Sequence, residues 1–168
     1  GLAPYGEPIW KEKLLEKIFI LKPNGKYHLN TKLCNYHLAL DNIFEPELEA
    51  MFCKKRSINS KPNKNHINLA ASVQAAFEDA LIHILKPVFN KNIKKLVLSG
   101  GCALNVTANG KLIKNKYFDE IIIPPAPHDA GCAIGAALCA MKKRNIKFYL
   151  SEIRNPYQGR NFTNEEIS

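Results

Sequence analysis

The sequence predicts an α/β fold that contains a layer of parallel strands. Two observations carry this prediction. Short apolar runs at residues 95–99 and 120–123 have the length of buried strands, and segments with helical spacing precede and follow each of them. Parallel strands require crossover connections, which are usually helices, so the alternation of helix and strand favours a parallel sheet.

The first region, residues 1–65, is expected to hold a β-hairpin. One or two helical turns are expected at 11–17, before an apolar run at 18–21 that has the composition of a strand. The turn-forming tripeptide Pro-Asn-Gly follows, and residues 26–29 then form the returning strand.

The rest of that region is interpreted as a connector. Glu-Pro-Glu at residues 45–47 favours a short helix that ends near Phe52, because proline suits the first helical turn. The polar stretch at 57–65 shows no periodicity, so we expect a loop there that is disordered or open to proteolysis. A basic cluster, Lys-Lys-Arg at 54–56, is interpreted as part of a solvated loop.

A long amphipathic helix opens the second region, residues 66–150. Apolar and small side chains recur at helical spacing across 68–89. Pro87 should bend this helix or end its regular hydrogen bonding. Two further helices are expected, at 103–114 after the first strand and at 130–144 after the second.

The sharpest motif is Leu-Ser-Gly-Gly-Cys-Ala-Leu-Asn at residues 98–105, in which a strand delivers Gly100 and Gly101 to a helix start. Glycine permits a tight turn and lets a ligand approach the backbone. Free N–H groups at a helix start favour an anion or a polar edge. The motif is neither a P-loop nor a dinucleotide fingerprint, and a Gly-Gly turn by itself is more often structural.

Two asparagines follow on the predicted helix. Asn105 and Asn109 lie four residues apart, so both can face one side. Their amides could line the mouth of a pocket. They could equally reflect the abundance of asparagine in this chain, which is the simpler interpretation when the pair is taken alone.

The second motif, Pro-Pro-Ala-Pro-His-Asp-Ala-Gly at residues 124–131, presents one acid between a strand and a helix of small residues. Strand ends are where α/β folds place ligands. Asp129 could cap the helix or hold a divalent metal near phosphates. Gly131 and Gly135 leave a flat helix surface for a neighbouring backbone or a nucleotide. His128 is a weaker ligand candidate, because adjacent side chains point in different directions.

Composition narrows the class of protein. The net charge is +9, which suits an anionic partner, but the lysines are scattered and do not favour nucleic acid. No apolar run reaches the roughly 18 residues of a membrane helix. Five cysteines without a CxxC pair disfavour a disulfide framework or a structural zinc site and indicate a reducing cytoplasm. The chain starts without Met or a signal peptide, so we expect it to begin inside a larger protein.

Taken together, the motifs resemble the nodulation-type O-carbamoyltransferases, a family that includes cephamycin and tobramycin carbamoyltransferases. Besides the two motifs above, the resemblance covers Gly-Leu-Ala-Pro-Tyr-Gly at 1–6, Leu-Ala-Ala-Ser-Val-Gln at 69–74, Asn-Gly-Lys-Leu at 109–112 and Asn-Pro-Tyr-Gln-Gly at 155–159. Their order and spacing match the family across nearly the whole chain, although no single motif is specific.

The resemblance implies a fold and a reaction. The fold is the second half of an actin-like domain, the ribonuclease H-like fold of sugar kinases and Hsp70, and residues 66–150 would be its nucleotide-binding subdomain. Carbamoyl phosphate and ATP would form carbamoyl-adenylate in a YrdC-like domain, and residues 151–168 would begin the linker toward it. The carbamoyl group would then move to a hydroxyl of a small-molecule or sugar acceptor beside a divalent metal, usually iron.

The resemblance also implies site residues. Gly100, Gly101, Asn105 and Gly131 would bind the nucleotide, and Asp129 would be the catalytic residue and the carboxylate ligand of the metal. Two metal-binding histidines of the family lie upstream of this stretch, and the YrdC-like domain lies downstream, so the chain alone is expected to be inactive. Apolar surfaces that would contact the first half of the actin-like domain could instead contact a second copy of this chain and form a dimer.

Two other interpretations stay open. A different actin-like ATP-binding enzyme, such as a sugar kinase, is compatible with the Gly-Gly turn, but it would not be expected to carry Leu-Ala-Pro-Tyr-Gly or Pro-Pro-Ala-Pro-His-Asp. A non-catalytic nucleotide-binding or assembly module is the other. A dependence on carbamoyl phosphate would separate the carbamoyltransferase from the kinase.

Overall fold

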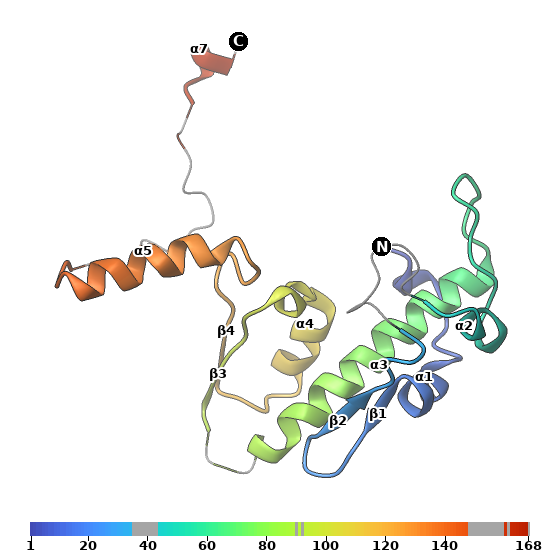
Figure 1. The fold of residues 1–168 in the computed structure, drawn as a ribbon. Helices are drawn as coiled ribbons and strands as arrows, with labels where there is room; N and C mark the ends of the chain where they lie inside the picture. Colours follow the sequence, from blue (N-terminus) through green and yellow to red (C-terminus); the bar gives the residue numbers. More distant parts are fainter. Residues whose placement is uncertain (35–43, 90, 92, 148–159, 161, 168) are drawn as a thin grey trace. The chain divides into compact units, whose positions relative to one another are not determined.

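The computed structural model describes residues 1–34, 44–89, 91, 93–147, 160 and 162–167. These residues form a mixed α/β structure with one antiparallel and one parallel sheet (Figure 1). The chain divides into two compact units, Gly1–Ile93 and Lys94–Ser168. This division differs from the boundary expected at residue 65, because the long helix packs with the N-terminal elements.

The first unit begins with a short turn, a helix and a hairpin, which are η1 (Ala3–Tyr5), α1 (Lys11–Lys17), β1 (Phe19–Leu21) and β2 (Tyr27–Leu29). The two strands pair antiparallel, with Ile20 opposite His28. Asn24 and Gly25 in the turn both have positive φ angles, of 60° and 72°. Asn-Gly favours this backbone in hairpin turns, so the predicted hairpin is confirmed.

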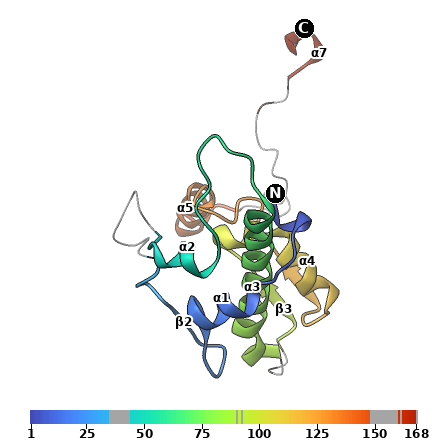
Figure 2. The ribbon, with the colours of Figure 1, turned by 90° about the vertical axis from the view of Figure 1, so that its right-hand side faces the viewer.

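Helix α3 (Lys64–Phe89) runs along the whole first unit, and Figure 2 shows α1 beside it. The core between the two helices and the hairpin contains Leu14, Ile18 and Ala76. The predicted helix is confirmed, but it continues beyond Pro87 to Phe89. Proline therefore does not end the helix, and Pro87 lies only two residues before its last residue, so a single backbone hydrogen bond to the His83 carbonyl is lost.

Buried polar groups of α3 hold the N-terminal segment. The Asn68 side-chain oxygen accepts a hydrogen bond from the Glu7 N–H, and the Ser72 hydroxyl oxygen accepts one from the Trp10 N–H, each at 3.0 Å. A Cβ atom at Gly6 would lie 2.4 Å from the Ile67 carbonyl oxygen. The segments 1–6 and 69–74 are therefore neighbours, although most of the first unit separates them in sequence.

A short helix and a loop connect the hairpin to α3. Helix α2 (Glu47–Met51) starts after Pro46, as predicted, and the Lys13 ammonium donates to the Met51 carbonyl at 2.7 Å. The following residues extend beyond the start of α3 (Figure 1). The predicted loop ends at Asn63, whose side chain caps α3.

The second unit contains the parallel sheet and its helices: β3 (Lys95–Val97), η2 (Gly101–Leu104), α4 (Val106–Lys114), β4 (Glu120–Ile122) and α5 (Gly131–Lys143). Leu96 lies opposite Ile121 in parallel register, which confirms the predicted strand order. The expectation that the first strand is buried is wrong, since Val97 is 64% exposed. A parallel strand is buried only when other elements cover both faces of its sheet. The sheet of two described strands has little such cover.

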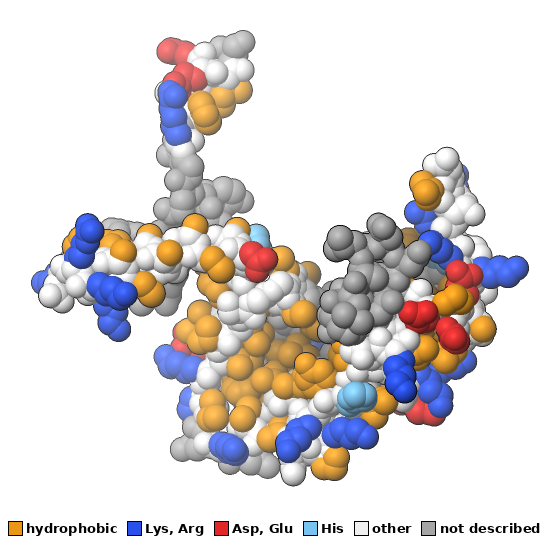
Figure 3. Space-filling model, in the orientation of Figure 1, with side chains coloured by type: hydrophobic (Ala, Val, Ile, Leu, Met, Phe, Trp, Pro, Cys, Tyr) orange, Lys and Arg blue, Asp and Glu red, His pale blue; other side chains and the backbone are white. Residues whose placement is uncertain are grey.

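Helix α5 has no buried residue. Figure 3 shows hydrophobic side chains along it and Lys or Arg side chains at its far end. Among the helices of the described ranges, none is both long and apolar enough to cross a lipid bilayer.

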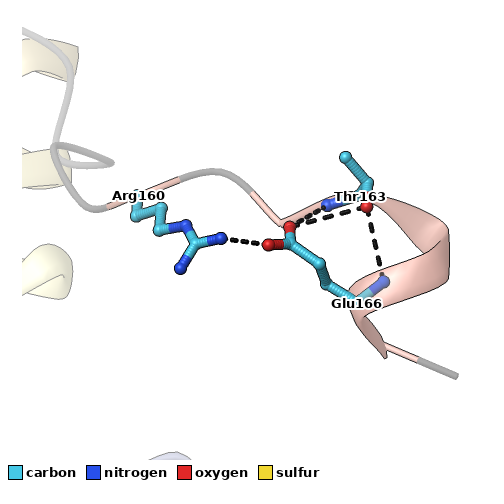
Figure 4. A network of polar contacts seen from close by, with 3 residues as sticks. All are labelled: Arg160, Thr163 and Glu166. Carbon is cyan, nitrogen blue, oxygen red and sulfur yellow. Dashed lines mark hydrogen bonds and ion pairs between the residues drawn. The ribbon is translucent and has the colours of Figure 1, made fainter.

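The chain ends in a single helical turn, α7 (Asn164–Ile167). Thr163 and Glu166 cap it reciprocally: the Glu166 carboxylate accepts from the Thr163 N–H at 2.9 Å, and the Thr163 hydroxyl accepts from the Glu166 N–H at 3.4 Å. Arg160 pairs with the same carboxylate (Figure 4). The predicted motif at 155–159 lies outside the described residues, as does most of the predicted linker.

Candidate functional site

The second unit contains a pocket of about 930 Å³ where its two parallel strands end. It is lined by the turn that follows β3, by all of β4 with the loop after it, and by the first turns of α5. This is the edge at which open α/β sheets bind ligands. Its lining consists of Ser99, Gly100, the run from 120 to 129, Gly131, Cys132, Ile134, Gly135 and Leu138.

Gly100, in the strand-to-helix turn, has a backbone conformation that other residues rarely adopt. After β3 the Leu98 N–H still bonds the Ile122 carbonyl at 3.0 Å, and Gly100 then adopts φ 94° and ψ 164°. This conformation is almost restricted to glycine. Gly101 begins η2 and does not line the pocket, and a Cβ atom there would meet nothing within 4 Å.

The two sequence motifs are joined directly. The Gly100 N–H donates to the Pro127 carbonyl oxygen at 2.6 Å, and the Ser99 hydroxyl donates to the same oxygen at 3.2 Å. Pro127 is buried. The Gly-Gly turn and the proline-rich loop therefore form one wall of the pocket.

Gly131 serves a close backbone contact. A Cβ atom at this position would lie 2.2 Å from the Ala126 carbonyl oxygen, so the proline-rich loop occupies the space beside the helix start. Gly135, one turn later, has no such neighbour within 4 Å and remains open to the pocket. The flat helix surface was expected to receive either a neighbouring backbone or a nucleotide. At Gly131 it receives the neighbouring backbone.

The two asparagines have structural roles. The expected helix at 103–114 begins later than predicted, because residues 101–104 form a 3-10 turn and Asn105 is the N-cap of α4. The Asn105 side chain accepts from the Ala108 N–H at 3.1 Å, and the buried Asn109 amide donates to the Ala103 carbonyl at 2.8 Å. Neither residue lines the pocket.

Asp129 is displayed at the rim of the pocket. It is exposed, and its carboxylate forms no hydrogen bond or ion pair within the described part of the chain. It does not cap α5, whose N-cap is Ala130. His128 also lines the pocket, and its Nδ1 accepts a hydrogen bond from the Ala130 N–H at 3.3 Å.

For the expected metal, the described residues offer one suitable ligand at the pocket and no complete binding site. Asp129 offers a free carboxylate, which suits a divalent cation. However, no group of three or more His, Cys, Asp or Glu side chains converges anywhere in the described ranges. Any metal bound here would need ligands beyond those that the structure describes.

The pocket wall is largely apolar, and no Lys or Arg of the described residues contributes to it. Ile122, Ile134 and Leu138 contribute hydrocarbon surface, while Glu120 is paired with Lys95 at 2.6 Å. Sequence reasoning missed Ile134 and Leu138. With Gly131 and Gly135 they follow the spacing i, i+3, i+4, i+7, which marks one helix face and was a usable signal.

Known relatives share most of this chain. The family model described as carbamoyltransferase N-terminus matches residues 1–138. Nodulation protein NolNO of Sinorhizobium fredii is 38% identical over 82% of this chain and 19% of its own length. Nodulation protein NolO of Bradyrhizobium diazoefficiens is 32% identical over 100% of this chain and 29% of its own length.

A cyanobacterial relative matches at a similar level. The uncharacterized protein sll1178 of Synechocystis is 36% identical over 99% of this chain. The chain spans only 28% of that relative, so each of these three proteins is more than three times as long as the stretch it shares. The matched range 1–138 includes both motifs that form the pocket wall, and this chain belongs to the family of the carbamoyltransferase N-terminal domain.

Proposed function

We propose that this chain forms the nucleoside-binding half of an actin-like domain in an ATP-dependent O-carbamoyltransferase. Its family membership supports carbamoyl transfer. The parallel strands with helical connections support the actin-like half-domain. The observation that carries the proposal is the Gly100–Pro127 hydrogen bond, because it joins both motifs into one pocket at the strand ends.

The pocket suits the adenosine part of ATP better than its phosphates. Apolar walls at Ile122, Ile134 and Leu138 can cover a purine, and the open helix face at Gly135 permits close approach. Among the described residues, no Lys or Arg lines the pocket to neutralise a triphosphate. The phosphate groups would therefore extend toward the rim, where groups outside this lining meet them.

The proposed chemistry ends with transfer to a hydroxyl. Water first hydrolyses carbamoyl phosphate to carbamate and inorganic phosphate. A carbamate oxygen then bonds to the α-phosphorus of ATP, pyrophosphate leaves, and carbamoyl-adenylate results. In the transfer step the oxygen of the acceptor hydroxyl bonds to the carbamoyl carbon. The bond from that carbon to the adenylate oxygen breaks, AMP leaves, and the hydroxyl proton is released. The acceptor in this proposal is a hydroxyl-bearing small molecule or sugar.

Asp129 is the residue proposed to act in this step. A divalent metal, iron in this proposal, would supply Lewis-acid chemistry when bound. Asp129 would provide one oxygen ligand from the rim, where its carboxylate is exposed and unpaired within the described residues. No group of three or more His, Cys, Asp or Glu side chains converges among the described residues to complete a metal site. We therefore further propose that the chain alone is inactive.

Product analysis tests the proposal. The chain alone, and the longer protein that carries it, are each given ATP, carbamoyl phosphate, ferrous iron and a panel of hydroxyl acceptors. The longer protein should release AMP and a carbamoylated acceptor, only when carbamoyl phosphate is present. ADP with a phosphorylated acceptor would instead identify a kinase, and turnover by the chain alone would refute the division of labour.

A further inference from the structure

A second pocket, of about 430 Å³, lies in the first unit between the end of α2 and the start of α3. It is separate in sequence from the strand-end pocket, and none of its residues belongs to the two motifs discussed above. Its lining consists of Cys53, Lys54, Lys55, Arg56, Ser57, Ser60, Lys61, Asn63, Asn65 and His66.

The lining of this pocket is strongly cationic. Lys54, Lys55, Arg56 and Lys61 all contribute to it, and it contains no Asp or Glu. None of these four side chains forms an ion pair with a carboxylate of the described residues. Like charges that line one pocket repel one another, and a bound anion relieves that repulsion.

The loop around the pocket has a defined shape. The Arg56 guanidinium donates to the carbonyls of Ser57, Ile58 and Ser60, and thereby holds the loop closed. The Ser60 hydroxyl adds a hydrogen bond to the Ser57 carbonyl at 2.9 Å. Arg56 therefore organises the wall, while the ammonium groups of the lysines remain available to a ligand.

His66 fastens this loop to the start of α3. Its Nδ1 accepts from the Asn63 N–H at 3.1 Å, so Nε2 carries the hydrogen that it donates to the Lys54 carbonyl at 2.9 Å. Asn63 returns a bond from its side chain to the His66 N–H. The first turn of α3 has no acidic residue, so the positive end of this long helix adds to the field of the lysines.

We infer that this pocket binds the phosphate group of a small phosphorylated molecule. Several unpaired ammonium groups and a helix start match a multiply charged oxyanion better than a single carboxylate. The cations are gathered in one pocket rather than spread along a stripe, as an extended nucleic-acid backbone would require. The inference does not depend on the proposed carbamoyl transfer, since it uses none of the residues of the strand-end pocket.

Calorimetric titration of the full chain with pyrophosphate tests the inference. Binding should be saturable, with one molecule per chain, and should weaken by about tenfold in the double variant Lys54→Gln/Lys61→Gln. The matched control is Lys142→Gln/Lys143→Gln at the end of α5, which removes the same charge far along the sequence. The control should change the affinity by no more than about twofold.

Four outcomes would overturn the inference. The first three are the absence of saturable binding, equal weakening in the two double variants, and equal affinity for succinate, which would show mere attraction of any dianion. A short single-stranded RNA that binds through Lys54 and Lys61 more tightly than pyrophosphate would also replace the small-molecule ligand. Circular dichroism of both variants controls for folding, since all four substituted lysines are exposed. Adenosine binding, which probes the other pocket, should be unchanged by Lys54→Gln/Lys61→Gln.

Discussion

The backbone N–H of Gly100 and the carbonyl oxygen of Pro127 form a hydrogen bond of 2.6 Å that links the Gly-Gly turn to the proline-rich loop. The bond fixes the direction in which the chain leaves β3, and it places Asp129 two residues beyond the acceptor. A substitution in one motif should therefore alter the shape of the whole pocket.

Gly100→Ala should destabilise the protein by about 1–3 kcal/mol, because a side chain is strained at φ 94° and ψ 164°. Gly101→Ala is the matched control, since its added Cβ would meet nothing within 4 Å. Urea unfolding of the two variants measures the difference. Equal stability of both variants would show that the Gly100 backbone is not the constrained element.

Gly131→Ala should destabilise by about 1–3 kcal/mol, because the new Cβ would press on the Ala126 carbonyl oxygen at 2.2 Å. Gly135→Ala on the same helix should instead stabilise, by up to about 1 kcal/mol, since alanine is the better helix former and the site is open. Thermal unfolding of the pair gives opposite signs. A loss of stability in Gly135→Ala would contradict the open helix face.

Asp129→Asn should leave stability within about 0.5 kcal/mol of the parent, because the carboxylate is exposed and unpaired among the described residues. The same substitution should abolish carbamoyl transfer and reduce bound metal in the longer protein. Asp119→Asn, another exposed acid of the second unit, serves as the control for charge. Full activity with normal metal content in Asp129→Asn would remove this residue from the proposed site.

Burial raises the pKa of the Cys34 thiol above its ordinary value of 9.0. The unfolded chain loses this proton near that value, whereas the folded chain retains it to higher pH. The contribution of the thiol to stability is thus fully present below pH 9.0 and is lost as the pH rises through the folded-state pKa. Urea unfolding on both sides of pH 9.0 should show a shallower decline for Cys34→Ala than for the parent. An unchanged slope in Cys34→Ala would contradict the assignment.

Local signals were sufficient for most of the elements. Asn-Gly fixed the hairpin turn, Pro46 marked the start of α2, and the alternation of apolar runs and helices gave the parallel strand order. The predicted start of α4 at residue 103 was too early. Asparagine is a favoured N-cap, so Asn105 was a usable signal for the later start. The exposure of Val97 depends on which layers cover the sheet, and a strand's own composition does not report that.

The pocket was foreseen only in part. Gly100, Asp129 and Gly131 were predicted and do line it, whereas Gly101 and Asn105 were predicted and do not. The Gly100–Pro127 bond joins backbone atoms of two loops, so no side-chain pattern encodes it. Glycine at position 131 suggested close approach, but the approaching group was the Ala126 backbone, which only the packed structure identifies.

NMR titration of the isotopically labelled full chain with adenosine tests whether the strand-end pocket holds this nucleoside. Adenosine is preferable to ATP here, because it carries no phosphate that the basic pocket of the first unit could bind. Adenosine should cause saturable shifts of the backbone amide signals of Gly100, Ile134 and Gly135, and cytidine should cause a much weaker response. No saturable shift at these amides, or an equal response to the two nucleosides, would show that this pocket does not hold adenosine.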